Sequence, residues 1–222
     1  MKKLIILAAV IAIFAIGANA DDVAMGKGMT AKGVKFGVNL TKLTGDGVDM
    51  IIDELTAYGA NAENKMWLAF GGGVFFEYSF SPQFAVQPEF LFMMKGTKFD
   101  ATVGTVTESA KLKFTYIEVP ILMKFKIPTE GNFKPNIFAG PAVDLLLSAK
   151  AANGGSIDIK PAFKDIDFGV AFGAGFMYAL EKGGITFDAR YTLGLTDIPD
   201  TGGLGSISMK HTNISFMLGY AF

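Results

Sequence analysis

Apolar and polar residues alternate with a period of two along most of the chain after residue 30. Such alternation predicts β-strands with two chemically different faces, because successive side chains of a strand point to opposite sides. Eight segments of this kind are bounded by turn signals, and they cover residues 33–40, 67–80, 84–95, 111–127, 136–148, 167–178, 185–196 and 213–222. We therefore expect an all-β, eight-stranded antiparallel barrel, since closed bacterial barrels have even strand numbers.

The connections between these segments alternate between short turns and long polar stretches. The turns cover residues 81–83, 129–133 and 181–184, and the long stretches cover residues 41–66, 96–110, 149–165 and 197–212. Transmembrane barrels of outer membranes have short periplasmic turns and long external loops, so we expect both chain ends on the periplasmic side. Apolar residues at helical spacing within 48–58 predict a short surface helix in the first external loop.

The apolar face of the expected strands points to lipid. Most aromatic residues of the eight segments lie on that face, whereas the other face is rich in Gly, Ala, Ser and Thr. The interior of an eight-stranded barrel is just wide enough for side chains to fill it, so it could not hold so many rings. These volumes favour a transmembrane barrel over a soluble barrel of the lipocalin kind. Aromatic residues beside the short turns predict a girdle at the periplasmic interface.

The first twenty residues have the pattern of a secretory signal peptide. Lys2 and Lys3 precede an apolar run, and Ala18-Asn19-Ala20 forms a small-residue cleavage motif. We expect cleavage after Ala20, which leaves residues 21–222 as the barrel domain. With the barrel pattern, this signal predicts export to the outer membrane of a diderm bacterium.

Composition excludes several classes of protein. Without Lys2 and Lys3 the chain carries 18 basic and 21 acidic residues, a net charge of −3, and it has no basic run. We therefore expect no nucleic-acid partner. The chain has no Cys and one His, His211, which excludes disulfides, thiolate sites and multi-histidine metal sites. We expect no metal and no cofactor.

The last expected strand ends the chain on alternating apolar residues. These residues are Phe216, Leu218, Tyr220 and Phe222. An apolar alternation that finishes on a C-terminal Phe resembles the assembly signal of outer-membrane barrels, so it predicts contact with the barrel-assembly machinery. Three prolines within expected strands each remove a ladder donor, and we expect local bulges at Pro88, Pro120 and Pro141.

Charged residues fall on the small-residue face of the expected strands. They are Lys35, Glu77, Glu89, Glu118, Lys124, Asp144, Asp188 and Arg190. Charges at membrane depth are costly unless paired, so we expect an ionic network inside the barrel. When residues are counted from the periplasmic ends of the strands, charges at similar depth should meet. Arg190 should then pair with Glu89 or Glu118, and Lys124 should lie near Glu77 or Asp188.

The expected network has two interpretations. It is a salt-bridged plug that fixes strand register, or it lines a gated path for protons or small ions. Six larger side chains should also point inward and leave little room for solute: Phe75, Tyr116, Leu122, Phe138, Leu146 and Met177. The plug is the favoured interpretation.

Enzymatic chemistry has weak support in the sequence. His211 is the only possible histidine base, and it stands where the last loop meets the last strand, so we expect it to be solvated. Ser215 should lie deeper in the barrel, whereas Ser206 and Ser208 belong to a loop expected to be floppy. We therefore expect no catalytic triad. Asp165, Asp167 and the acids of the first loop are expected to form a solvated rim.

Several motifs resemble the PorT-type outer-membrane β-barrel family of Bacteroidetes-like bacteria. They are Val86-Gln87-Pro88-Glu89-Phe90-Leu91-Phe92, Tyr116-Ile117-Glu118-Val119-Pro120-Ile121-Leu122, Ala139-Gly140-Pro141, Asp167-Phe168-Gly169 and Asp188-Ala189-Arg190-Tyr191-Thr192-Leu193-Gly194-Leu195. The resemblance runs in order over the mature chain and implies an eight-stranded barrel of the OmpA/OmpX kind. It implies little about activity, although the namesake is linked to protein secretion.

Three functions remain open. We favour a non-enzymatic surface scaffold that contacts outer-membrane lipids and, through its loops, an extracellular or envelope protein, or else an accessory of an export machine. The alternative is a narrow gated channel. The third is a lipid-modifying enzyme.

Overall fold

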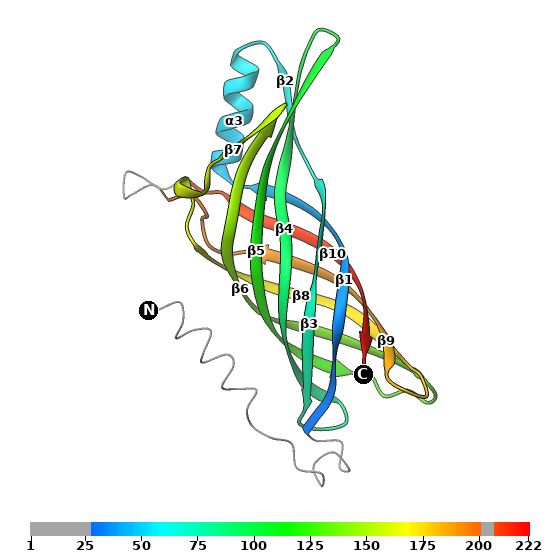
Figure 1. The fold of residues 1–222 in the computed structure, drawn as a ribbon. Helices are drawn as coiled ribbons and strands as arrows, with labels where there is room; N and C mark the ends of the chain where they lie inside the picture. Colours follow the sequence, from blue (N-terminus) through cyan, green and yellow to red (C-terminus); the bar gives the residue numbers. More distant parts are fainter. Residues whose placement is uncertain (1–27, 201–206) are drawn as a thin grey trace.

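The computed structural model describes residues 28–200 and 207–222 of the chain (Figure 1). The expected signal peptide, residues 1–20, lies outside the described residues. No helix in the described part of the chain is long and apolar enough to cross a membrane.

Eight long antiparallel strands form the body of the described chain. They are β1 (Gly28–Thr44), β3 (Trp67–Ser79), β4 (Phe84–Val103), β5 (Val106–Lys126), β6 (Phe133–Asn153), β8 (Ile166–Ala179), β9 (Gly184–Gly194) and β10 (Lys210–Ala221). Each of these strands pairs with the next along the chain, and β1 pairs with β10, so the ring is closed. The predicted eight-stranded antiparallel barrel is confirmed.

Shorter elements gather at the end of the barrel opposite to the tight turns (Figure 1). They are α3 (Asp46–Ala57), β2 (Asn61–Lys65), β7 (Gly155–Asp158) and the 3-10 helix η1 (Lys160–Ala162). α3 confirms the helix predicted in the first loop. β2 extends the sheet beside β4, and β7 extends it beside β6.

The expectation of a loop over residues 96–110 is wrong. β4 and β5 continue past the barrel as a hairpin in which Asp100 lies opposite Ser109 and Val103 opposite Val106. Gly104 has a φ of 61° in the two-residue turn, a conformation that glycine adopts without strain. Phe99, Ala101 and Val103 alternate with polar residues and were a signal for this hairpin, but the expectation of a long external loop after each strand overrode that signal.

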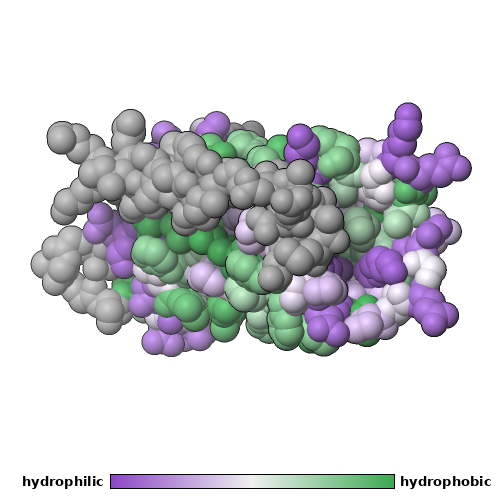
Figure 2. All heavy atoms as spheres, turned by 90° about the horizontal axis from the view of Figure 1, so that it is seen from below, coloured by the Kyte–Doolittle hydropathy of each residue, from purple (hydrophilic) through white to green (hydrophobic). Residues whose placement is uncertain are grey.

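The two faces of the barrel wall differ as predicted. Large apolar side chains point outward, and Phe36 and Phe70 are 67% and 59% exposed, whereas the inward-facing Glu89 and Tyr116 are fully buried. Figure 2 shows the molecule from below. Where residues are coloured, green hydrophobic ones lie over the middle of this face, and purple hydrophilic ones are more frequent toward its left and right ends. Glycines on the inward face let adjacent strands approach closely. At Gly73, for example, a Cβ would lie only 1.9 Å from the Phe90 carbonyl oxygen, so a larger residue would clash.

The three strand prolines do not produce bulges, contrary to the expectation. Pro88 lies opposite Ile121, Pro120 opposite Ala142 and Pro141 opposite Val170, and the register is unchanged on both sides of each proline. The irregularities in register fall instead between Met29 and Ala31 and between Thr115 and Tyr116. Each proline lacks a backbone N–H and therefore removes one hydrogen bond of the ladder. It does not cause a bulge, because the neighbouring residue pairs hold the register.

Aromatic side chains meet near the tight turns, where the girdle was expected. Tyr78 contacts Phe80 at 5.4 Å between ring centroids, and Phe84 contacts Phe125 at 5.2 Å. Phe216, Leu218 and Tyr220 of β10 and Phe222 after it are also exposed on the outward side, which is the geometry that their alternation predicts. Their role in assembly stays a prediction.

Replacing Phe172, which lies midway along β8 on the outward face, with Arg should lower the free energy of unfolding by about 2–4 kcal/mol, because the charge would enter the hydrocarbon core. Phe84→Arg, at the periplasmic edge, is the matched control and should cost only about 0–1 kcal/mol. Urea unfolding in phospholipid vesicles measures both. Equal costs at the two depths would contradict the assignment of the lipid-facing wall.

Candidate functional site

A group of four charged side chains crosses the middle of the lumen. Lys35 of β1 binds two carboxylates, with its Nζ 2.8 Å from Glu89 Oε1 and also in contact with Asp188. Arg190 Nη2 lies 2.9 Å from Glu89 Oε2. The structure thus brings together Arg190 and Glu89, one of the two pairs expected from depth. These contacts join β1, β4 and β9, strands that are far apart in the sequence.

Small residues beside this central group make room for it. Gly173 lies opposite Arg190 and Gly175 opposite Asp188, because β8 presents its glycines to the inward face of β9. Aromatic rings supply the remaining contacts, since the Arg190 guanidinium lies 5.4 Å from the ring centroid of Phe138. A cation over an aromatic face is stabilised electrostatically, so Phe138 helps to hold the charge in place.

A second group lies toward the tight turns and is built around Glu77. Lys124 Nζ is 3.1 Å from Glu77 Oε2 and donates to Gln87 Oε1 at 2.8 Å. Lys126 Nζ lies 3.1 Å from Glu77 Oε1. Of the two neighbours expected for Lys124, the structure places Glu77 in contact with it.

A third group lies toward the external end and contains a lysine that the sequence analysis missed. Lys95 Nζ is 2.7 Å from Glu118 Oε2 and 2.6 Å from Asp144 Oδ2. Arg190 Nη1 is 4.0 Å from Glu118 Oε1, so Arg190 also links this group to the central one. Lys95 stands at the end of the expected segment 84–95. It is an even number of residues from Gln87 and Glu89, which was a signal that it shares their inward face.

Three carboxylates stand side by side in this third group. Glu118 lies opposite Asp144, and Asp144 lies opposite Asp167, on the adjacent strands β5, β6 and β8. The expectation that Asp167 belongs to a solvated rim is wrong, since its exposed fraction is 2%. β8 begins at Ile166, one residue before it, and the strand turns its side chain into the lumen.

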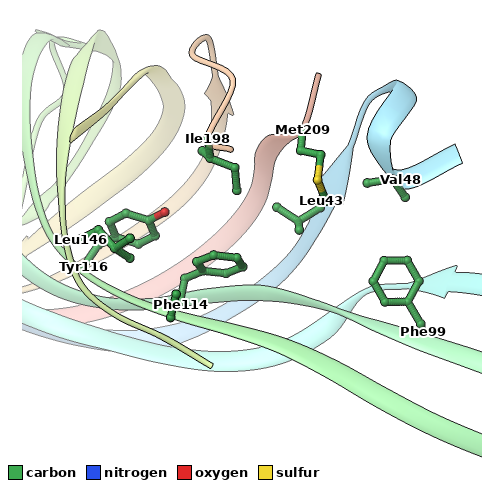
Figure 3. Close-up of a cluster of buried hydrophobic side chains, with 9 residues drawn as sticks. Leu43, Val48, Phe99, Phe114, Tyr116, Leu146, Ile198 and Met209 are labelled. Atoms are coloured by element: carbon green, nitrogen blue, oxygen red, sulfur yellow. The ribbon is translucent and has the colours of Figure 1, made fainter. Parts of the chain in front are cut away.

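An apolar cluster fills the external end of the barrel, as Figure 3 shows. Its buried residues are Leu43, Val48, Phe99, Phe114, Tyr116, Leu146, Ala149, Ile198 and Met209. We call this set the external plug. Val48 belongs to α3, so the helix of the first loop packs against the plug. Of the side chains expected to point inward, Phe75, Tyr116, Leu122, Phe138 and Leu146 are buried, and Met177 lines the periplasmic cavity described below.

His211 is buried beside the external plug, so the expectation that it is solvated is wrong. Its Nε2 lies 3.1 Å from the Tyr116 hydroxyl, and its ring packs edge-on against Phe114. β10 begins at Lys210, and pairing of Leu43 with His211 fixes the imidazole on the inward face. Sequence reasoning treated residues 197–212 as one loop and therefore could not assign this residue a face.

Neither Ser208 nor Ser215, the described serines near His211, forms a triad with it. Ser208 is held, contrary to the expected floppy loop: its hydroxyl donates to Asp197 Oδ1 at 2.7 Å, and its carbonyl accepts the Gly47 amide at 2.9 Å. Ser215 lies on the inward face of β10 opposite Arg190. Ser206 lies outside the described residues. Within the described chain, no cluster of three His, Asp or Glu residues could hold a metal ion.

A cavity of about 400 Å³ opens at the end with the tight turns. Its lining includes Lys35, Glu77, Lys124, Lys126, Asn136 and Asp188. We call it the periplasmic cavity. Lys35 and Asp188 of the central charge group line it, and the rest of that group, the third group and the external plug lie farther along the lumen.

The β4–β5 hairpin outside the barrel carries its own charge cluster. Asp100 Oδ1 lies 2.8 Å from Lys98 Nζ and accepts a hydrogen bond from Ser109 at 2.7 Å, and Lys65 Nζ lies 3.2 Å from Asp100 Oδ2. Hydrogen bonds from Lys98 and Ser109 hold the pKa of the Asp100 carboxyl well below its ordinary value. Glu63 and Asp100 in turn raise the pKa of Lys65. These contacts tie β2 to the hairpin.

Replacing Arg190 with Met should lower the free energy of unfolding by about 3–5 kcal/mol, because Glu89 and Glu118 would lose the guanidinium that balances them in a buried site. Urea unfolding in vesicles, followed by the heat-dependent gel shift, measures the change. The double variant Arg190→Met with Glu89→Gln should recover part of the loss, since it removes a stranded charge. An unchanged stability of Arg190→Met would contradict the network.

A comparison with protein-family models identifies the family of the chain. The model of a family described as outer membrane protein beta-barrel domain matches residues 20–200. A comparison with curated protein sequences finds no match. Among solved structures the chain is similar to Neisserial surface protein A, with a TM-score of 0.48 and 13% identity over 88% of this chain and 100% of that chain.

Two further solved barrels show a similar likeness. Ail of Yersinia pestis, solved in complex with the heparin analogue sucrose octasulfate, has a TM-score of 0.44 and 16% identity over 86% of this chain and 98% of that chain. OprG of Pseudomonas aeruginosa has a TM-score of 0.44 and 15% identity over 88% and 96% of the two chains. Because the family model covers most of the sequence, the chain belongs to the outer membrane protein β-barrel domain family and resides in the outer membrane.

Proposed function

We propose that this protein is a non-conducting barrel that presents an external binding surface to another macromolecule. The observation that carries the proposal is the division of the molecule along its axis. Charge groups and the external plug occupy the lumen, whereas β2, β7, α3 and the β4–β5 hairpin extend outside it. A barrel that only anchored itself in lipid would not need this extension.

The lumen argument rests on successive obstructions. From the periplasmic cavity outward, a solute would meet Lys35, Glu89 and Arg190, then the Lys95 group, then the aromatic rings of the external plug. Moving a charge past a buried, paired network requires breaking its contacts, which costs several kcal/mol in a low-dielectric interior. A static plug needs no such opening.

The binding argument rests on apolar side chains that the external extension exposes. Val103 and Val106 at the hairpin tip are about as exposed as the lipid-facing Phe36, although they lie beyond the barrel wall, and Ile157 of β7 and Tyr58 after α3 are more exposed still. We call these four residues the external apolar set. Exposed apolar side chains on several external elements support a surface that a partner covers.

The purified, refolded barrel should therefore give no discrete openings in a planar bilayer at neutral or low pH. Heat-shifted gel mobility first establishes that the protein is folded. The double variant Phe114→Ala, Ile198→Ala lacks two side chains of the external plug. Its conductance shows how much current leaks when the plug is thinner, and the wild-type conductance is compared with it. Stable, discrete openings of the wild-type protein would overturn the non-conducting half of the proposal.

A photo-crosslinking amino acid at position 106 should give a discrete macromolecular adduct in intact outer membranes, because the proposal places a partner at the hairpin tip. The same amino acid at position 70 is the control, since Phe70 faces lipid and should give lipid adducts only. Mass spectrometry of the gel-shifted bands identifies the adducts. Identical products at the two positions would overturn the proposed binding surface.

The finer family assignment and the absence of enzymatic activity are part of the proposal. The strand motifs that resemble the PorT-type family support a partner from an export machine, reached through the periplasmic cavity, as a second form of the interaction role. The burial of His211 against Phe114 and Tyr116 supports a non-enzymatic barrel, because a general base must reach its substrate.

A gated channel remains the second candidate, and one observation favours it. The periplasmic cavity of about 400 Å³ already reaches Lys35 and Asp188 from one side, so only the contacts from the central charge group outward would have to open. The bilayer measurement described above separates this candidate from the closed barrel.

A further inference from the structure

Four lysines occupy neighbouring positions on the outward face of the sheet, just beyond the lipid-facing wall. Lys98 of β4 lies opposite Lys111 of β5, and Lys113 of β5 lies opposite Lys150 of β6. Phe114, next to Lys113 in β5, is fully buried on the inward side, so Lys113 and Lys111 point outward. We call these four residues the lysine patch.

Acidic residues of this protein leave most of the lysine patch unbalanced. Lys98 pairs with Asp100. Within the described residues, Lys111, Lys113 and Lys150 form no ion pair. Asp158 lies opposite Lys150, but its Oδ1 accepts the backbone amide of Lys160 at 2.9 Å. Like charges directly opposite each other destabilise a strand pair, so this arrangement favours an anion from outside the chain.

The lysine patch stands at the external edge of the membrane. The indole of Trp67 lies over Gly96, where a Cβ would approach the ring to 3.2 Å, and Lys113 Nζ lies 5.8 Å from that ring's centroid. Tryptophan is enriched at membrane–water interfaces. Farther down the same strand pair, Phe92 lies opposite Ile117 on the lipid-facing wall. The lysines are therefore at headgroup level, with acyl chains below them.

We propose that the lysine patch binds the phosphate groups of an anionic lipid in the outer leaflet. Lysine is a compact point charge that binds phosphate well, and its flexible stem can follow the wall up to the headgroups. Lys113 and Lys150 lie directly opposite each other on adjacent strands, so they can share one phosphate, and Lys111 adds a third charge on the same face of β5. Because the patch adjoins the lipid-facing wall, a lipid contacts both the lysines and the aromatic and aliphatic surface beneath them. A soluble phosphate would contact the lysines alone.

The test is native mass spectrometry of the folded, detergent-solubilised protein with diphosphorylated lipid A as the probe. The variant Lys111→Gln, Lys113→Gln, Lys150→Gln should weaken retention at least about tenfold, given the attraction of each surface lysine for anionic lipid. The matched control is Lys160→Gln, Lys164→Gln, Lys182→Gln, which removes the same charge from a loop and a turn and should retain the lipid as the wild type does. Arg at the same three patch positions should also retain it.

Three results would overturn the proposal. They are unchanged retention by the patch variant, equal retention of lipid A that lacks its phosphates, and full displacement of lipid A by inorganic phosphate, which would show that the acyl chains add nothing. Heat-shifted gel mobility of every variant excludes loss of folding as a cause. The inference does not rest on the proposed function. Lipid retention is measured independently of conductance and of crosslinking at the hairpin tip, so either proposal can fail while the other holds.

Discussion

The structure depends on one constraint: inside lipid, every backbone N–H and C=O group must find its partner within the protein. Pairing of β1 with β10 meets that constraint because it leaves the barrel without a free edge. Closure with eight strands makes the lumen so narrow that side chains fill it. The inward face is consequently restricted to small residues, with the larger and charged ones packed against each other.

The buried charges follow from that narrow lumen. Lys35, Glu89 and Arg190 come from strands that are distant in sequence, so their contacts form only when the whole ring has closed in the correct register. Desolvation makes such a network a weak source of net stability, but an uncompensated charge would be far worse. The network therefore acts chiefly against wrong registers, since a one-residue slip of β9 would turn Arg190 toward lipid.

The two ends of the barrel differ in chemistry. Toward the periplasm, Lys124 and Lys126 surround an open cavity, whereas toward the outside the rings of Phe114 and Tyr116 close the lumen. Above that closure the wall continues as the β4–β5 hairpin, whose outward face changes from apolar to lysine-rich where the membrane ends. One sheet thus passes through lipid, headgroup level and water, and its residues change with the surrounding medium.

Strand number, the lipid-facing side and the choice of Glu89 or Glu118 as partner of Arg190 could be predicted from the sequence, because period-two alternation assigns each residue a face and a depth wherever the two sides of a strand differ. The tertiary structure decided that residues 96–110 pair as a hairpin, because a short alternation does not show how far two strands stay paired beyond the membrane. It also decided the burial of His211 and Asp167, since each lies at a strand end whose position depends on pairing with a distant strand. Local pattern determines which way a side chain points within a strand, whereas only partner strands determine where that strand begins and ends.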